Sequence, residues 1–137
     1  MGYDLRPRNK GVETFSMGAF SYGWMMETTV GLVVGYGSGL EPGSYVCYKR
    51  EDGCDLMHND GGRVSAKEAK EMAKMARLVA EQQDRLHYHF EKLDEVNKKS
   101  YQENKYKLYN LPVRKDFIEK IRNFADFAEK SGGFRVY

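Results

Sequence analysis

The chain has 137 residues, 41% of them hydrophobic, which is the size and composition of a single folded domain spanning residues 1–137. Its 22 basic and 20 acidic side chains leave a net charge of +2, which argues against an extended nucleic-acid footprint or strong attraction to an anionic membrane. Ten tyrosines suit either strands and half-buried helix faces or a ligand pocket.

Cysteine usage and the N-terminal segment predict a cytoplasmic protein. The two cysteines, Cys47 and Cys54, are too few for a disulfide scaffold, so free thiols are expected, with a bridge closing a hairpin as the alternative. The first residues contain no apolar stretch of the kind found in signal peptides. The most apolar segment, from Val30 to Tyr36, is too short to cross a bilayer.

The N-terminal part of the chain predicts a strand, a helix and a hairpin. Residues 3–8 predict a short strand that ends near Pro7, and residues 12–28 repeat aromatic and methionine side chains at a helical spacing. Residues 29–36 and 44–50 are rich in β-branched and apolar side chains, so they predict two strands joined by a glycine-rich loop.

A long amphipathic helix is the clearest feature of the sequence. Ser65 and Glu68 have the spacing of a capping box at a helix start. In this motif each side chain accepts a hydrogen bond from the backbone N–H of the other residue. A stripe with a three-and-four spacing follows, to about residue 100: Ala69, Met72, Ala76, Val79, Gln83, Leu86, Phe90, Leu93 and Asn97. Such a helix is about 50 Å long. Polar residues within a stripe, here Gln83 and Asn97, can set the register between paired helices.

A second helix is expected at about 113–130, because Pro112 suits a first helical turn and apolar residues recur from Phe117 to Ala128. The residues from Ser131 to Gly133 end this helix, and residues 134–137 predict a strand. The expected fold class is therefore α+β, with a small antiparallel sheet, the long helix (about 65–100) and an antiparallel C-terminal helix. Because the long stripe outruns the C-terminal helix, the sequence also predicts a homo-oligomer through the long helix, most simply a two-fold dimer.

Several patterns suggest chemistry without completing a known motif. The glycines from Gly35 to Gly39 favour a hairpin loop over a phosphate loop, because no helix signal follows them. Cys47, Cys54 and His58 lack the paired spacing of a zinc site, so no metal or cofactor is expected. Motifs for activated nucleophiles are absent, which predicts that the protein is not an enzyme. An enzyme with an unrecognised site is kept as an alternative, after the two binding functions described below.

Local positive charge and aromatic side chains favour an anionic ligand. Arg6 and Arg8 lie in the basic segment 1–10, and lysines alternate with tyrosines over 98–115. Such a combination suits phosphates and stacked bases, or else a solvated linker. Trp24, the single tryptophan, fits either core packing or one wall of a pocket.

Four segments together carry a resemblance: MGYDLRPRN from Met1 to Asn9, GAFS from Gly18 to Ser21, NDGGRVSAKEA from Asn59 to Ala69, and FADF followed by SGGF from Phe124 to Phe134. With these segments the chain resembles a family of small uncharacterised proteins encoded by bacteria and their phages. The resemblance implies a small accessory protein. Accessory proteins of phages at this size often inhibit host proteins or sequester nucleotide immune signals, which is an analogy of context and not of fold.

These observations predict a non-enzymatic accessory protein that binds or sequesters a small anionic, nucleotide-type ligand. The candidate ligand-binding residues are Arg6, Arg8, Ser21, Trp24, Asn59 and Asp60. The arginines would pair with phosphates, Trp24 would stack on a ring, and the Asn59 and Asp60 side chains would contact polar edges. The alternative prediction is a protein–protein interaction module that inhibits or regulates a host protein.

Overall fold

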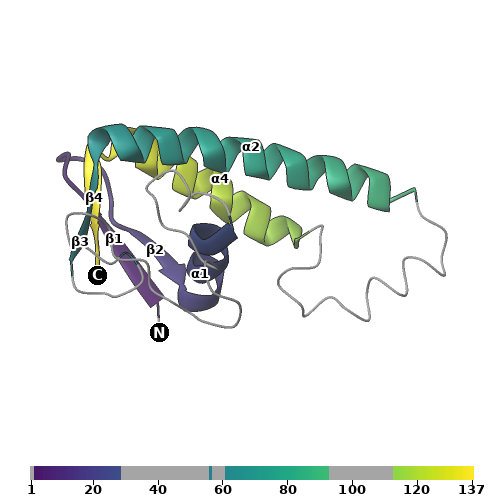
Figure 1. Cartoon of the computed structure of the whole chain (residues 1–137), viewed down its shortest axis with the longest axis horizontal. Coiled ribbons are helices and arrows are strands. Elements are labelled where there is room, and N and C mark those ends of the chain that lie inside the picture. Colours follow the sequence, from purple (N-terminus) through teal and green to yellow (C-terminus); the bar gives the residue numbers. More distant parts are fainter. Residues whose placement is uncertain (1, 29–55, 57–60, 93–112) are drawn as a thin grey trace.

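The computed structural model describes residues 2–28, 56, 61–92 and 113–137 (Figure 1). A four-stranded antiparallel sheet and two long helices make up most of this part, which confirms the predicted α+β class. In chain order the elements are β1 (Gly2–Pro7), β2 (Phe15–Gly18), α1 (Ala19–Thr28), β3 (Gly62–Ser65), α2 (Ala66–Phe90), α4 (Lys115–Lys130) and β4 (Gly133–Val136).

The sheet has the strand order β2-β1-β4-β3, so the strand that comes last in the sequence lies between β1 and β3. Leu5 of β1 is paired with Val136 of β4, and Phe134 of β4 is paired with Val64 of β3. All four side chains are buried. Because side chains alternate along a strand, the residues between them point to the opposite face. There the exposed residues include Arg6, Arg63 and Arg135, together with Asp4 and Ser16.

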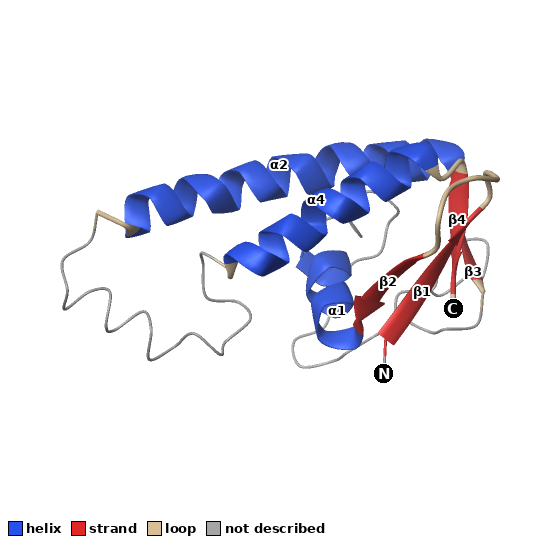
Figure 2. Cartoon of the chain, turned by 180° about the vertical axis from the view of Figure 1, so that it is seen from behind, coloured by secondary structure: helices blue, strands red, loops and turns tan. Residues whose placement is uncertain are grey.

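The helices lie on one side of the sheet, as Figure 2 shows. Their apolar side chains and the inward-facing strand residues form one core, which includes Tyr22, Met25 and Trp24 of α1. The Tyr22 hydroxyl donates a hydrogen bond of 2.6 Å to the carbonyl of Leu56. No described helix or strand packs on the other face of the sheet. Among the described residues, no helix combines the length and apolarity that a membrane span requires.

The capping box predicted at the start of the long helix is confirmed. The Ser65 hydroxyl accepts a hydrogen bond of 3.1 Å from the backbone N–H of Glu68, and the Glu68 carboxylate accepts one of 3.0 Å from the backbone N–H of Ser65. α2 ends at Phe90, so its 25 residues are about 37 Å long. The continuation expected to about residue 100 lies outside the described residues beyond Lys92.

α2 and α4 pack antiparallel, as predicted (Figure 1), and the apolar stripes of both helices are buried in the common core. The Arg77 guanidinium on α2 lies 2.7 Å from the Glu129 carboxylate and 3.2 Å from that of Asp126 on α4. The hydrogen bonds that Arg77 donates to Glu129 and, second, to Asp126 raise the pKa of Arg77 above its already high ordinary value. A second link joins Arg122 to Asp84.

Gln83, predicted to be a register-setting polar residue in the stripe of α2, has its partner within the chain. Its side chain is 1% exposed, and its carbonyl accepts a hydrogen bond of 2.9 Å from the backbone N–H of Val113. His87 Nε2, one turn later, contacts the carbonyl of Val113. The two side chains thus satisfy both backbone polar groups of the residue that leads into α4.

Two short strands were not expected from the sequence. The segment predicted as a helix over residues 12–28 contains β2 before α1 begins at Ala19, and β3 occupies the end of the segment predicted as a polar loop. The hairpin predicted from residues 29–36 and 44–50 falls outside the described residues. The strand predicted after Gly133 is confirmed as β4.

Candidate functional site

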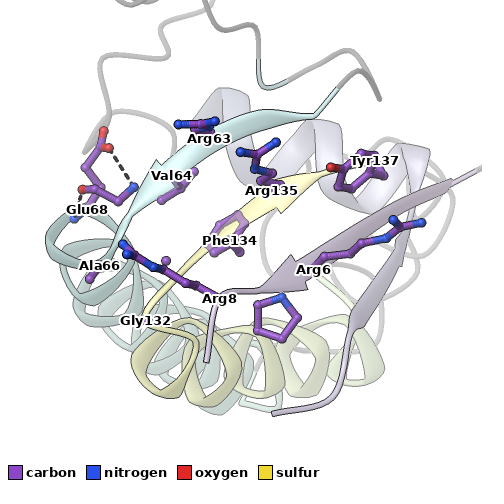
Figure 3. Close-up of a pocket in the computed structure, with 13 residues that line it drawn as sticks. Arg6, Arg8, Arg63, Val64, Ala66, Glu68, Gly132, Phe134, Arg135 and Tyr137 are labelled. Atoms are coloured by element: carbon purple, nitrogen blue, oxygen red, sulfur yellow. Dashed lines mark hydrogen bonds between the residues drawn. The ribbon is translucent and has the colours of Figure 1, made fainter. Parts of the chain in front are cut away.

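Three arginines form a row across the face of the sheet that no described helix covers. Arg135 on β4 is the register partner of Arg6 on β1 and of Arg63 on β3. Register partners in antiparallel strands have Cα atoms only about 4.5–5.5 Å apart. The sheet therefore holds three guanidinium-bearing side chains on neighbouring strands, and all three are exposed (Figure 3).

A fourth arginine extends this group. Arg8 follows Pro7 at the end of β1, and its backbone N–H donates a hydrogen bond of 2.9 Å to the carbonyl of Gly133. The four arginines line a cavity with a volume of about 680 Å³, here called the arginine pocket. Other lining residues are Ser65, Glu68, Phe134 and Tyr137.

The arginine side chains spread toward different ends of the arginine pocket. In Figure 3, Arg8 points toward the first turn of α2, whereas Arg6 points the other way, past Tyr137. The Arg6 guanidinium lies 4.2 Å from the centroid of the Tyr137 ring, a cation–π contact. Hydrogen bonds of 2.7 and 2.8 Å join the backbone of Tyr137 to that of Asp4, so the ring that supports Arg6 is anchored to the sheet.

The helical arginines differ from those of the arginine pocket in their acidic partners. On the helices and at the start of α4, each arginine of the described residues pairs with a carboxylate: Arg77, Arg85, Arg114 and Arg122. No carboxylate of the described residues forms an ion pair with Arg6, Arg8 or Arg135. Like charges directly opposite each other destabilise a sheet by roughly 0.2–1 kcal/mol per pair. The row thus carries a cost that a bound anion would remove.

The two lining groups that resemble catalytic side chains have structural roles. Ser65 and Glu68 form the capping box of α2, so their hydroxyl and carboxylate already hold backbone N–H groups. Glu68 also supplies one negative charge, so the side chains of the described lining residues, four arginines and one glutamate, sum to +3. The start of α2 adds the positive end of a helix dipole to the same side.

The structure brings together two of the predicted ligand-binding residues, Arg6 and Arg8. Trp24 and Ser21 belong to α1, on the helical side of the sheet, and do not line the arginine pocket. Trp24 is 5% exposed and packs edge-on against Phe117, with ring centroids 5.2 Å apart, so it is a core residue here. Asn59 and Asp60 lie outside the described residues.

Arg63 and Arg135 were not among the candidates from the sequence. Each is an exposed residue between two buried residues of its strand: Arg63 in GRVS (residues 62–65) and Arg135 in GFRV (residues 133–136). This alternation was the available signal, because an arginine flanked by inward-facing apolar residues must point outward from a strand. Their meeting with Arg6 depends on which strands pair, which the local pattern does not specify.

Other candidate chemistry finds little support in the described residues. His89 is exposed, while His87 contacts the Val113 carbonyl. No group of three histidine, cysteine or acidic side chains within residues 2–28, 61–92 and 113–137 could hold a metal ion. Gly35 to Gly39, Cys47, Cys54 and His58, and nearly all of the basic segment 98–115, lie outside the described residues.

Comparison with known protein families, with characterised proteins and with solved structures gives no match to this chain.

Proposed function

We propose that this protein binds a small anionic ligand of the nucleotide type in the arginine pocket and retains it without converting it chemically. The observation that carries the proposal is the row of Arg6, Arg135 and Arg63, where like charges face one another and no described carboxylate pairs with Arg6 or Arg135. A bound anion would turn this repulsion into charge-assisted hydrogen bonds.

Phosphate groups suit these side chains better than other common anions. A guanidinium presents a planar set of donors that matches phosphate oxygens two at a time, and arginine stays charged at every physiological pH. The volume of about 680 Å³ falls within the range of small-molecule pockets, roughly 300–1,000 Å³. The engagement of Ser65 and Glu68 in the capping box supports binding over catalysis.

The biological role that fits this proposal is sequestration. The resemblance to small bacterial and phage proteins suggests an accessory protein that removes a nucleotide signal from the cytoplasm of a bacterial or infected host cell. Such a protein needs tight binding and no turnover.

Isothermal titration calorimetry and thermal unfolding against a panel of nucleotides test this proposal. A true ligand at about one hundred times its Kd stabilises the fold by roughly 2.7 kcal/mol. Arg135→Gln should weaken binding at least tenfold, whereas Arg85→Gln, which changes a distant arginine on α2, should leave it unchanged. If no nucleotide binds, or if both variants bind like the wild type, the proposal is wrong.

We also propose that the protein forms a homodimer, which the outer face of α2 favours. Leu78 and Tyr88 are 62% and 59% exposed, and a shallow depression of about 300 Å³ lies beside Leu78. We infer a second copy of this chain as the occupant, packed antiparallel. In that arrangement Leu78 would meet Tyr88 of the other copy. Glu81 would meet Arg85 of the other copy, in place of the ion pair that these two residues form within α2.

Light scattering tests this dimer. The wild type should have about twice the monomer mass of 15.8 kDa, and Leu78→Asp should return it to the monomer without loss of helical signal. A wild type that stays monomeric at high concentration would refute self-association through this face.

A further inference from the structure

We infer that the ligand of the arginine pocket carries at least two phosphate groups, of which Arg8 contacts the outermost one. This rests on the proposed function, and it names the chemical class of the ligand: a nucleoside diphosphate or triphosphate, or another ligand with linked phosphates. The argument uses the charge, the extent and the direction of the four arginines.

The charge of the arginine pocket exceeds that of one phosphate. Arg6, Arg8 and Arg135, none of which forms an ion pair with a carboxylate of the described residues, together carry a charge of +3. A phosphate monoester carries only about −1.5 to −2 near neutral pH. A single phosphate would therefore leave at least one positive charge unmatched, whereas two or three linked phosphates would balance the pocket.

The extent of the arginine group leads to the same class of ligand. The row from Arg6 to Arg63 crosses three neighbouring strands, which are about 4.8 Å apart, so its backbone positions span roughly 10 Å. Arg8 lies two residues beyond Arg6, or roughly 7 Å further along the strand direction. One phosphate has too few oxygens and too small a radius to engage all four side chains.

The direction of the side chains assigns different roles to them. Arg135 lies in the middle of the row, next to both other arginines of the row (Figure 3). Arg8 turns away from Arg6 toward Ala66 and Glu68 at the start of α2. Arg135 should therefore contact any phosphate-bearing ligand, whereas Arg8 should contact only a ligand with a second or third phosphate.

Calorimetry with AMP, ADP, ATP, orthophosphate and pyrophosphate tests this inference on the full chain. Affinity should rise at least tenfold from AMP to ADP, and likewise from orthophosphate to pyrophosphate. Arg8→Gln should abolish most of this rise and change AMP binding less than about twofold. Arg135→Gln should weaken binding of all five compounds. These fold-changes correspond to one charge-assisted hydrogen bond or more.

A variant that is expected to bind more tightly distinguishes an effect on the site from a loss of folding. Glu68→Gln removes the one carboxylate among the described residues that line the pocket, and glutamine can still complete the capping box. It should bind pyrophosphate more tightly than the wild type, by about threefold or more at low salt, because interactions between exposed charges weaken as salt screens them.

Three results would overturn the inference. The first is equal affinity for AMP, ADP and ATP, and the second is a loss in Arg8→Gln that is the same for AMP as for ATP. The third is tighter binding of a ten-residue single-stranded DNA than of ATP, which would make the site a nucleic-acid track. Failure of the proposed function gives a different outcome, in which none of the phosphate compounds binds the wild type.

Discussion

Gly133 shows how one residue connects α4, the sheet and the arginine pocket. It has a φ of 97°, in the left-handed region that glycine adopts without a steric cost, and it follows Gly132 at φ 69°. A Cβ atom at Gly133 would lie 2.7 Å from the carbonyl oxygen of Val64. The side chain is therefore excluded both by the backbone conformation and by the neighbouring strand.

Gly133→Ala should lower the free energy of unfolding by about 2 kcal/mol or more, from left-handed strain and separation of β3 from β4. Gly11→Ala is the matched control, because Gly11 also has a positive φ, 85°, but open space around the position of a Cβ. It should cost about 1 kcal/mol. Urea unfolding of both variants measures the difference, and equal losses would show that the close approach to Val64 is unimportant.

Single residues also show what the sequence can reveal about a site. Arg6 and Arg8 stand in a basic segment, which is a local pattern, and the structure places both in the arginine pocket. Trp24 was the natural aromatic candidate, yet its contact with Phe117 lies in the core, because α1 follows β2 immediately and packs against the sheet. A pattern indicates which chemistry is available, whereas tertiary packing decides which face it occupies.

At the scale of the elements, the junction between α2 and α4 depends on two polar side chains. Gln83 accepts a buried hydrogen bond from the Val113 N–H, and His87 makes a part-buried contact with the Val113 carbonyl. When one partner of a buried hydrogen bond is removed, the remaining polar group can bond neither to it nor to water. This lowers the free energy of unfolding by about 1–3 kcal/mol. The start of α4 should therefore be sensitive to a change that has little effect on the rest of the helix.

Gln83→Leu should destabilise the fold by about 1–3 kcal/mol, although leucine is more apolar and a good helix former. Gln82→Leu, at the exposed neighbouring position on α2, should change the stability by less than about 0.5 kcal/mol. Thermal and urea unfolding give both values. A stabilised Gln83→Leu variant would contradict the role given to this hydrogen bond.

The elements that the sequence predicted have strong local signals, and those it missed do not. Ser65 and Glu68 define the start of α2 by themselves, and Ser131 with two glycines defines the end of α4. β2 and β3 have four residues each and lie directly before a helix, so the helical periodicity that follows masks their alternation. β2 is a strand because it pairs with β1, and β3 is a strand because it pairs with β4, which is distant from it in the sequence.

At the scale of the whole molecule, the charges are unevenly distributed although the net charge is only +2. The helical arginines are neutralised by neighbouring carboxylates, while four arginines gather in one pocket on the sheet. Such a concentration of one sign stores repulsion in the free protein and attracts anions from solution.

The row of arginines therefore predicts that binding and stability oppose each other. Without ligand and at low salt, Arg135→Gln should stabilise the protein by about 0.5–1 kcal/mol, because it removes the middle charge of the row. The gain should shrink at high salt. Urea unfolding at two salt concentrations measures it, and a destabilised Arg135→Gln variant at low salt would contradict the repulsion argument.

The central position of β4 also determines the order in which the protein can fold. β1 and β2 are close in the sequence and can pair as a hairpin without the rest of the sheet, but an isolated two-stranded hairpin is at best marginally stable in water. β3 pairs only with β4 in the described sheet, so the sheet remains divided until the ribosome has delivered residues 133–136. The pocket therefore cannot form before residues 133–136 have been made, because Arg135 lies 129 positions after its register partner Arg6. Such long-range pairing predicts slow folding, during which the β1–β2 hairpin is exposed to other chains.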